Sequence, residues 1–382
     1  MRAMAVIGTG LIGTSVALAA RRQGVRVFLS DRNPAAARTA AALGAGLAET
    51  PEEAVDLAVI AVPPSQVGIV LAASQERGLA VSYTDVASVK AGPERAVLNC
   101  APDPARYVGG HPMAGRERSG PLAARADLFQ GRPWALTPSR LTSSTAFDRA
   151  LELVELCGAV PVVMQSQVHD DTVALTSHVP HLVASLMAAR LQDAPADVSR
   201  LAGQGLRDVT RIAGGDSRLW SDILQANAGA VAGVVRDLHA DLSRLVSALD
   251  VLAEPEPCDR AHGMRTMVDL LDRGIAGLAA IPGARAGASA DDARVRVALP
   301  DWPGRLSRLL GAIADFGVAP EDVVVEVDDG DELTVRFAVP SRAAGPMTAM
   351  LKAGGWDAVR EDDAGSGRDA EDAALPNAGL LR

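Results

Sequence analysis

A glycine-rich segment with the sequence GTGLIG occupies residues 8–13 and directly follows the apolar run Ala3–Ile7. Where such a segment joins a strand to a helix, each glycine has a physical task. Gly8 permits a tight turn, Gly10 lets a ligand approach the backbone, and Gly13 allows the helix to pack closely on the strand. The N-terminus of that helix offers free N–H groups to phosphates. The segment therefore predicts a βαβ unit that binds a dinucleotide.

The preferred dinucleotide depends on the acid that ends the second apolar run. Asp31 lies 18 residues after Gly13, where a carboxylate binds the adenine ribose hydroxyls and repels a 2′-phosphate. We therefore expect NAD, while Arg32 is the residue that would favour NADP instead. The residues expected to line the coenzyme site are Gly8, Gly10, Leu11, Ile12, Gly13, Asp31, Arg32 and Val62.

Residues 1–165 alternate short apolar runs with helix-compatible stretches. Strands that are almost continuously apolar and separated by helices indicate a parallel sheet covered on both faces. The predicted strands are Ala3–Ile7, 25–30, 57–62 and Ala80–Asp85, with further edge strands at 134–137 and Val160–Val163. The pattern predicts an α/β fold, a Rossmann-type doubly wound domain over residues 1–165.

From residue 166 to 282 the pattern changes to long helical periods without strands. Val231, Leu238 and Leu245 belong to one apolar stripe with three- and four-residue spacing, and Met264 and Leu271 belong to the next. Helices this apolar must bury against each other or against a second subunit. We expect an all-helical domain that binds substrate and forms a homodimer.

The last part of the chain has a third pattern. Residues 283–292 are small and glycine-containing, which is typical of a linker. Residues 293–361 predict the order β-α-β-β-α-β of a ferredoxin-like domain, with a turn at Asp301 to Gly304 and a hairpin around Asp329 and Gly330. The acidic, Ala- and Gly-rich residues 362–382 are expected to be disordered.

Bulk properties exclude several classes of protein. The net charge of −10 argues against nucleic acid or an anionic membrane as a partner. Cys100, Cys157 and Cys258 are too few and too widely spaced for a disulfide framework or a zinc site, which fits a reducing compartment. No apolar run approaches the roughly 18 residues that a membrane span needs. We expect a soluble, cytoplasmic protein.

His111 is the strongest candidate for a catalytic base, because an imidazole with an ordinary pKa of roughly 6.5 accepts a proton near neutral pH. It follows two glycines and precedes Pro112, so it is expected on a turn beyond a strand of the sheet. Ser88 follows the strand that ends at Asp85, at the edge where ligands bind in open α/β sheets. Ser88 is expected to bond to the imidazole or to the nicotinamide amide, or to cap the next helix.

Two pairs of polar residues recur in the helical part. His178 and His181 lie three residues apart, but nothing nearby completes a set of ligands, so no metal is expected. They are candidates for substrate contact or for cross-linking the helices. Arg207 and Arg211 lie on one predicted helix, where they either bind an anionic group or form a solvated face.

Taken together, these motifs resemble the prephenate/arogenate dehydrogenase family of tyrosine biosynthesis. The resemblance rests on GHPMAG at residues 110–115 with Glu117 and a Ser-Gly pair after it, DVASVK at 85–90, SHVPH at 177–181 and RDVTR at 207–211, followed by Trp220. It covers residues 1 to about 280. The segment DWPGRL at 301–306 resembles the start of an ACT domain, an amino-acid-sensing module.

The resemblance implies roles for single residues. His111 accepts the proton of the ring hydroxyl while hydride passes to the nicotinamide, and Ser88 orients His111. Arg211 holds a substrate carboxylate, for which a planar guanidinium fork is suited. His181 assists in binding the substrate and Arg207 lines the entrance. Glu117 is a candidate partner for an ammonium group, or for a neighbouring arginine.

The sequence therefore predicts an NAD-dependent oxidative decarboxylation of prephenate to 4-hydroxyphenylpyruvate. Arogenate, which would give tyrosine directly, is the alternative substrate. The ACT-like unit either binds an amino-acid effector, tyrosine, or serves only as a dimer contact. A β-hydroxyacid or imine reductase would use a lysine on the helical domain, but none occurs between Lys90 and Lys352. A non-enzymatic amino-acid sensor is a further alternative, which the intact glycines and His111 oppose.

Overall fold

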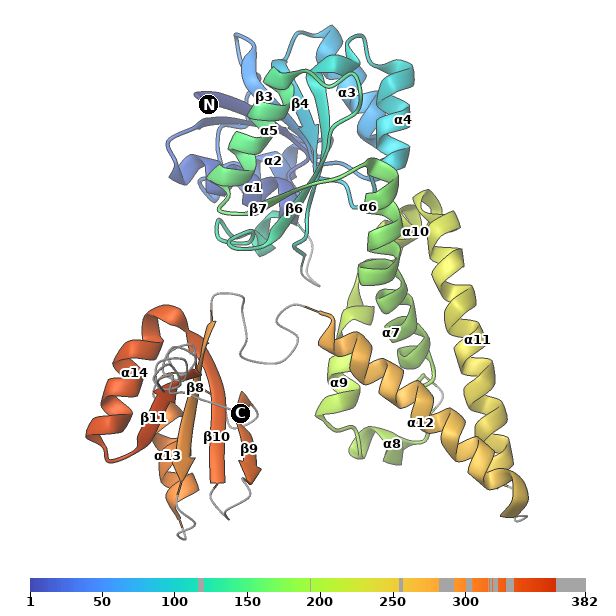
Figure 1. The fold of residues 1–382 in the computed structure, drawn as a ribbon. Coiled ribbons are helices and arrows are strands. Elements are labelled where there is room, and N and C mark those ends of the chain that lie inside the picture. The colour runs from blue at the N-terminus through green and yellow to red at the C-terminus, as the bar shows by residue number, and fades with distance from the viewer. Residues whose placement is uncertain are drawn as a thin grey trace, which may run out of the picture. The chain divides into compact units, whose positions relative to one another are not determined.

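The computed structural model of the protein describes residues 1–115, 120–192, 194–253, 257–281, 292–299, 304–314, 316, 318, 322–327 and 333–361. The chain forms two compact units, Met1–Ala240 and Asp241–Arg382, which we describe separately. Figure 1 shows the helices and strands of both. The predicted linker, the turn at 301–303, the hairpin at 329–330, the tail and Glu117 lie outside the described residues.

The first unit is built on a seven-stranded sheet with the order β2-β1-β3-β4-β5-β6-β7. Neighbouring strands are parallel from β2 through to β5, but β6 runs antiparallel to β5. The sheet is therefore mixed, which corrects the predicted all-parallel arrangement. The strands are β1 (Ala3–Ile7), β2 (Arg26–Ser30), β3 (Val55–Ile60), β4 (Ala80–Asp85), β5 (Tyr107–Pro112), β6 (Pro133–Thr137) and β7 (Val160–Val163).

Helices cover both faces of this sheet, as the apolar strands require. The core on one face includes residues of α1 (Leu11–Arg22), α2 (Pro34–Ala42) and α5 (Ser144–Leu156). The core on the other face includes residues of α3 (Val67–Glu76) and α4 (Ala91–Cys100). Short 3-10 turns lie at Pro64–Gln66 (η1), Pro104–Arg106 (η2) and Pro121–Ala123 (η3).

Strand β5 corrects the sequence prediction most directly, because it contains His111 instead of ending before it. The two glycines before His111 are therefore part of the strand, and His111 does not lie on a turn beyond it. A Cβ on Gly109 would lie 2.4 Å from the Thr137 hydroxyl, and a Cβ on Gly110 would lie 2.6 Å from the Asp85 carbonyl oxygen. The glycines are needed for close packing, so they fix His111 in the sheet.

The rest of the first unit is helical. A long helical stretch consists of α6 (Ser166–Val173), a π-helical turn η4 (Ala174–His178) and α7 (Val179–Ala189). Pro180 lacks the N–H that would bond to the carbonyl one turn back, which favours the wider turn before it. The following elements are α8 (Ala196–Arg200), α9 (Gln204–Arg211), η5 (Ile212–Gly214), α10 (Ser217–Ala226) and α11 (Ala228–Ala253), which continues into the second unit.

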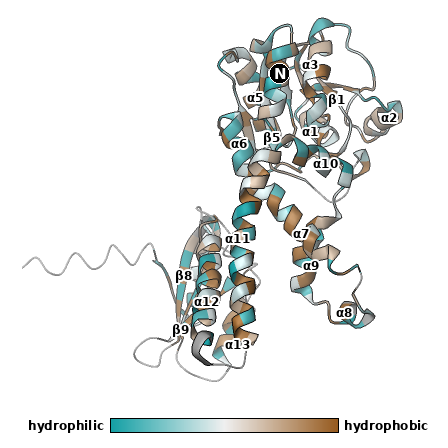
Figure 2. Cartoon of the chain, turned by 90° about the vertical axis from the view of Figure 1, so that its right-hand side faces the viewer, coloured by the Kyte–Doolittle hydropathy of each residue, from teal (hydrophilic) through white to brown (hydrophobic). Residues whose placement is uncertain are grey.

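These helices have a small core of their own and a large apolar surface. Ala174, Val179 and Val231 form the buried centre. Figure 2 shows apolar positions along α7 and α9, and several of these side chains are exposed. They include Val183, Leu186, Met187 and Val209. Contiguous apolar surface of this kind is typical of a face that a partner covers.

The second unit contains the end of α11, the helix α12 (Pro257–Ala279) and a four-stranded antiparallel sheet with the order β11-β8-β10-β9. Arg244 and Arg273 both pair with Asp241. The sheet consists of β8 (Asp292–Leu299), β9 (Val324–Val327), β10 (Leu333–Pro340) and β11 (Asp357–Arg360), with α13 (Arg305–Ala314) and α14 (Ser341–Ala353) between them. Among the described residues, the elements follow in the predicted order β-α-β-β-α-β.

The stretch Ser166–Ala189 is the single described helical segment that is long and apolar enough, by composition alone, to span a membrane. It carries His169 and Asp170, which are 1% and 2% exposed and hydrogen-bonded to other parts of the first unit. Buried polar side chains with such partners are typical of a packed helix in a protein core.

Candidate active site

The glycine loop has the geometry that a dinucleotide requires. Gly8 has φ +100°, and a Cβ there would lie 2.1 Å from the Ala61 carbonyl oxygen. Gly13 approaches the Gly8 carbonyl so closely that a Cβ would lie 2.0 Å from its oxygen. Gly10 faces open space and begins α1 without a side-chain cap. The first N–H groups of α1 therefore remain available to a pyrophosphate, so the residues fit NAD.

The remaining predicted coenzyme residues surround this loop. Asp31 Oδ2 accepts hydrogen bonds from the Thr9 backbone N–H at 2.7 Å and the Thr9 hydroxyl at 3.0 Å, which holds the carboxylate beside the glycines. Val62 Cγ1 lies 3.4 Å from the position that a Cβ on Gly8 would take. Leu11 and Ile12, the first residues of α1, are partly buried and pack against the core. Arg32 is exposed.

His111 lies on β5 at the same edge of the sheet as the glycine loop, because β1 and β5 run in the same direction. The residue is 9% exposed. Its Nδ1 lies 2.8 Å from Nε2 of His169, and the two rings meet edge to face with centroids 5.1 Å apart. Within the described part of the chain its Nε2 makes no hydrogen bond. That nitrogen is therefore the one available to a substrate.

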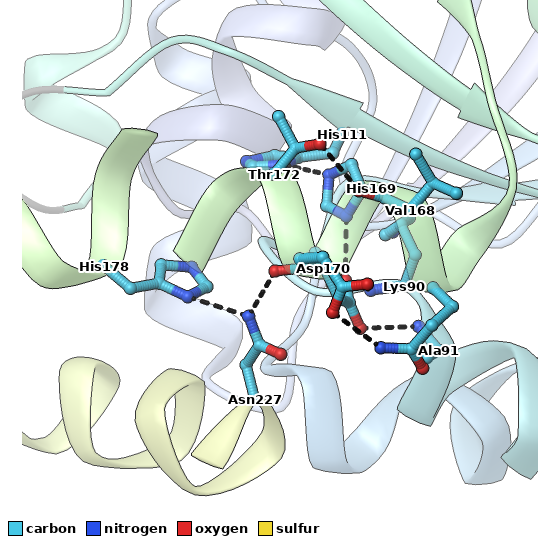
Figure 3. Close-up of polar contacts among 12 residues, drawn as sticks. Lys90, Ala91, His111, Val168, His169, Asp170, Thr172, His178 and Asn227 are labelled. Atoms are coloured by element: carbon cyan, nitrogen blue, oxygen red, sulfur yellow. Dashed lines mark hydrogen bonds and ion pairs between the residues drawn. The ribbon is translucent and has the colours of Figure 1, made fainter. Parts of the chain in front are cut away.

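A chain of hydrogen bonds continues from His169 into the start of α4 (Figure 3). His169 Nδ1 lies 2.8 Å from Asp170 Oδ1. The same oxygen accepts the Lys90 backbone N–H at 2.7 Å, and Oδ2 accepts the Ala91 backbone N–H at 2.9 Å. Both residues of the His169–Asp170 pair come from α6.

Asn227 extends this hydrogen-bond network from Asp170 to His178 (Figure 3). Its Nδ2 donates to the Asp170 carbonyl oxygen at 2.7 Å and lies 3.2 Å from His178 Nδ1. Asn227 follows α10 directly, so the contact joins the ends of two helices through buried polar groups.

Lys90 lies behind the histidines in a fully buried polar cluster. Its ammonium bonds to the Asp85 carboxylate and donates to the Gly110 carbonyl oxygen at 2.5 Å. Tyr107 donates its hydroxyl to the other Asp85 oxygen at 2.6 Å. Burial lowers the pKa of Lys90, an effect that Asp85 opposes. Burial and the same carboxylate raise the pKa of Tyr107 well above its ordinary value.

Burial also controls the charge of the histidines. It lowers the pKa of His111 well below 6.5, and His169 and Lys90 act in the same direction. Burial lowers the pKa of His178 to about 4, against the opposing effect of Asp170. His111 is therefore a neutral ring with a free lone pair at physiological pH, which is the state that a general base needs.

His181 belongs to a second cluster on α7 and α10. Its ring stacks on Trp220 with centroids 3.6 Å apart and an interplanar angle of 7°. Burial lowers the pKa of His181, while a hydrogen bond with the Ile212 backbone opposes this effect. Arg211 immediately precedes Ile212, so the structure brings the end of α9 next to His181. Arg207 is exposed and donates to the Ala202 carbonyl oxygen at 3.3 Å.

Ser88 does not have the partner that the resemblance implied. The position at Nδ1 of His111 is taken by His169, and Ser88 makes no hydrogen bond among the described residues. Nor does Ser88 cap the next helix, because α4 begins at Ala91 with Lys90 in the cap position. Ser88 is half-buried in the loop after β4.

His169, Asp170 and Asn227 are site residues that the sequence motifs do not predict. A signal was present in the adjacent His–Asp pair near the start of an otherwise apolar helix. Buried ionisable residues require partners, so such a pair indicates a hydrogen-bonded site. Its partners could not be named, because His111 lies 58 residues away in the chain.

Comparisons with known proteins agree along most of the chain. The family model "Prephenate dehydrogenase, nucleotide-binding domain" matches residues 16–163, and "Prephenate dehydrogenase, dimerization domain" matches residues 165–256. The "Probable prephenate dehydrogenase NovF" of Streptomyces niveus is 42% identical over 94% of this chain and 99% of its own length.

Two further relatives support the same assignment. The cyclohexadienyl dehydrogenase of Zymomonas mobilis is 34% identical over 64% of this chain and 88% of its own length. The crystal structure of prephenate dehydrogenase from A. aeolicus, in complex with hydroxyphenyl propionate and NAD+, has a TM-score of 0.59 and 26% identity. It covers 71% of this chain and 98% of that chain. The chain belongs to the prephenate dehydrogenase family.

Proposed function

We propose that the protein is an NAD-dependent oxidoreductase that converts prephenate to 4-hydroxyphenylpyruvate with loss of carbon dioxide. One observation carries the proposal. The free nitrogen of His111 lies at the same edge of the sheet as a glycine loop that fits a dinucleotide. The A. aeolicus relative, whose structure contains NAD+, has the same fold.

NAD, held by the glycine loop and Asp31, would supply the acceptor for a hydride from the ring carbon that carries the hydroxyl group. His111 Nε2 takes the hydroxyl proton in the same step, which contributes about 10²–10⁴-fold to such a reaction. The electrons of the bond to the ring carboxylate then enter the ring as carbon dioxide leaves. His111 returns its proton to the resulting phenolate oxygen, so the imidazole is neutral again at the end of the cycle.

The other predicted site residues have distinct tasks in this proposal. Arg211 binds a substrate carboxylate beside His181, and Arg207 lies at the entrance. Ser88 bonds to the nicotinamide amide, since His169 occupies Nδ1 of His111. Glu117, which lies outside the described residues, is the proposed partner for the ammonium group of arogenate, the alternative substrate.

Steady-state kinetics of His111→Asn test the assignment, with NADH formation as the readout. We expect turnover to fall by about two to four orders of magnitude while NAD affinity is retained. His239→Asn is the matched control, because His239 is exposed on α11. Unchanged turnover in the first variant would refute the role of His111.

Arogenate is the alternative substrate, and the relative named cyclohexadienyl dehydrogenase is the observation that favours testing it. The two substrates differ in a keto or an ammonium group on the side chain. Rates with each substrate, measured with NAD and with NADP, decide between them. A higher kcat/KM for arogenate would replace the first assignment.

The domain organisation is also a proposal: 1–165 for NAD, 166–282 for substrate binding and dimerisation, and 293–361 as a ferredoxin-like, ACT-like domain. The exposed apolar side chains of α7 and α9 support a homodimer. The sheet order β11-β8-β10-β9 supports the ACT-like assignment. Tyrosine is the proposed effector and the cytoplasm the proposed location. Titration of the full chain with tyrosine tests the effector, since unchanged kinetics and no heat of binding would exclude it.

A further inference from the structure

We propose that His169 and Asp170 are positioning residues that fix the tautomer of His111 and thereby select the nitrogen that accepts the substrate proton. The link to catalysis rests on the proposed function, whereas the tautomer is a property of the free protein. The hydrogen bonds that start at Asp170 determine where each proton lies.

The first step concerns the Asp170 carboxylate. It lies against two backbone N–H groups, those of Lys90 and Ala91, at 2.7 and 2.9 Å. A backbone N–H can only donate, and an ionised carboxylate can only accept. The contact between Asp170 Oδ1 and His169 Nδ1 at 2.8 Å must therefore be a donation from the ring. His169 carries a proton on Nδ1.

The second step transfers this constraint to His111. A neutral imidazole has one N–H and one lone pair, so a proton on Nδ1 of His169 leaves Nε2 as an acceptor. That Nε2 lies 2.8 Å from Nδ1 of His111. The Nδ1 of His111 must then donate, because two lone pairs at this distance would repel each other. The lone pair of His111 is placed on Nε2, the nitrogen without a partner in the described residues.

The hydrogen-bonded residues from Asp170 to His111 are held rigidly in place. His169 and Asp170 are almost fully buried, and the backbone donors to Asp170 come from the first residues at α4. The Lys90 side chain also donates to the carbonyl oxygen of Gly110, the residue before His111. Lys90 therefore holds both ends of the hydrogen-bond chain, Asp170 through its backbone and the His111 strand through its side chain. Asn227 fixes the Asp170 backbone from the opposite side. The imidazoles therefore have little freedom to rotate.

Other ionisable groups lie near His111, but none of them can take over the role of the His169–Asp170 pair. Lys90 and His178 act on it through charge, and Asp85 pairs with Lys90. Lys90 and Asp85 bond to each other, to Tyr107 and to backbone groups. His169 alone touches the ring nitrogen of His111 among the described residues.

Nitrogen-15 NMR of the full chain without substrate tests the tautomer directly. The protein has six histidines, so long-range proton–nitrogen correlations of the rings can be assigned with single His variants. We expect His111 and His169 to carry their protons on Nδ1 and to show unprotonated Nε2 signals at neutral pH. A proton on Nε2 of His111 would overturn the inference and would leave the assignment of His111 as the base to its own kinetic test.

Kinetics of substituted enzymes test the consequence. In His169→Gln the amide oxygen can still accept from Nδ1 of His111, whereas in His169→Leu it cannot. We expect kcat to fall at least about tenfold in the leucine variant, within the range of general-base catalysis, and much less in the glutamine variant. KM and NAD affinity should stay near their original values in both. Equal kcat in the two variants and the original protein would contradict the proposal.

A second pair of variants covers the case in which His169→Leu does not fold. Asp170→Asn replaces an oxygen that accepts a backbone N–H, so the tautomer of His169 is no longer imposed. Asp171→Asn changes the adjacent carboxylate, which is exposed and bonded to Gln167. We expect the NMR signature of His111 to change in the first variant only. An unchanged His111 signal in Asp170→Asn would refute the proposal that Asp170 fixes the tautomer of His111 through His169.

Discussion

The replacement Lys90→Met tests whether the buried ion pair behind His111 stabilises the fold. Methionine has a similar length and carries no charge, so it removes the ammonium with little change in volume. Asp85 would then lose its ionic partner while remaining 0% exposed, and the Gly110 carbonyl oxygen would lose its donor. Both groups would stay buried, and neither would keep the ammonium that now contacts it.

The magnitude follows from these losses. Removing one partner of a buried ion pair typically costs about 3–5 kcal/mol. Asp85 keeps donors in the Ala87 backbone N–H and the Tyr107 hydroxyl, at 2.7 and 2.6 Å, which lessens the penalty. The variant also no longer buries an ammonium, whose desolvation lowers the pKa of Lys90. We therefore expect a loss at the lower end, about 3 kcal/mol, in the free energy of unfolding.

Urea unfolding of the full chain, followed by circular dichroism and by hydrogen exchange of the β5 amides, measures the effect. Lys352→Met is the matched control, because Lys352 is the other lysine of the chain and is exposed. A surface change of this kind is expected within about 0.5 kcal/mol of the original protein. Equal stability of the two variants would refute the reasoning. Adding Asp85→Asn to Lys90→Met should recover part of the loss, since the orphaned charge is then removed.

Three further predictions concern the coenzyme loop, the pH dependence and the substrate. Gly13→Ala should weaken NAD binding at least about tenfold, because the new Cβ would meet the Gly8 carbonyl oxygen at 2.0 Å. Titration of both variants with NAD measures the effect, with Gly92→Ala as the control because a Cβ at that position meets open space. The pKa of His178 is about 4 in the folded protein against 6.5 ordinarily, so the unfolded chain binds the proton first and stability should fall as the pH drops from 6.5 to about 4. That loss, up to about 3 kcal/mol, should be absent from urea titrations of His178→Gln. Arg211→Ala should raise the KM for prephenate about tenfold or more with a smaller effect on kcat; equal KM values in Arg211→Ala and the exposed control Arg218→Ala would contradict it.

The sequence was sufficient where structure depends on local patterns. Strands β1 and β4 begin and end at the predicted residues, because each is a short apolar run bounded by a turn. The position of the glycine loop could be predicted, because the role of each glycine depends on the local geometry of the strand, turn and helix around it. The helical periods around Val231 and Leu271 fall within α11 and α12 as expected.

The errors arose where distant residues decide the outcome. The sequence predicts His111 on a turn beyond a strand, because nothing in the local sequence reveals that Thr137 and Asp85 lie against the two preceding glycines. The antiparallel direction of β6 depends on how residues 113–132 return to the sheet, which no periodicity encodes. The partner of His111 was missed for the same reason, because His169 belongs to a different element.

The π-helical turn Ala174–His178 has a consequence for how this helix can change. Eight residues of an ordinary α-helix would place His178 about 80° around the axis from Asp170. The π-helical turn lies between these two residues, and its larger number of residues per turn reduces that angle; Asn227 contacts the Asp170 carbonyl oxygen and His178 Nδ1. If this π-helical turn became an α-helical turn with the same number of residues, His178 and His181 would rotate about the helix axis relative to Asp170. The spacing of His169 and Asp170 from His178 and His181 along the chain therefore includes one π-helical turn, and a change in that turn would alter how the second pair is oriented relative to the first.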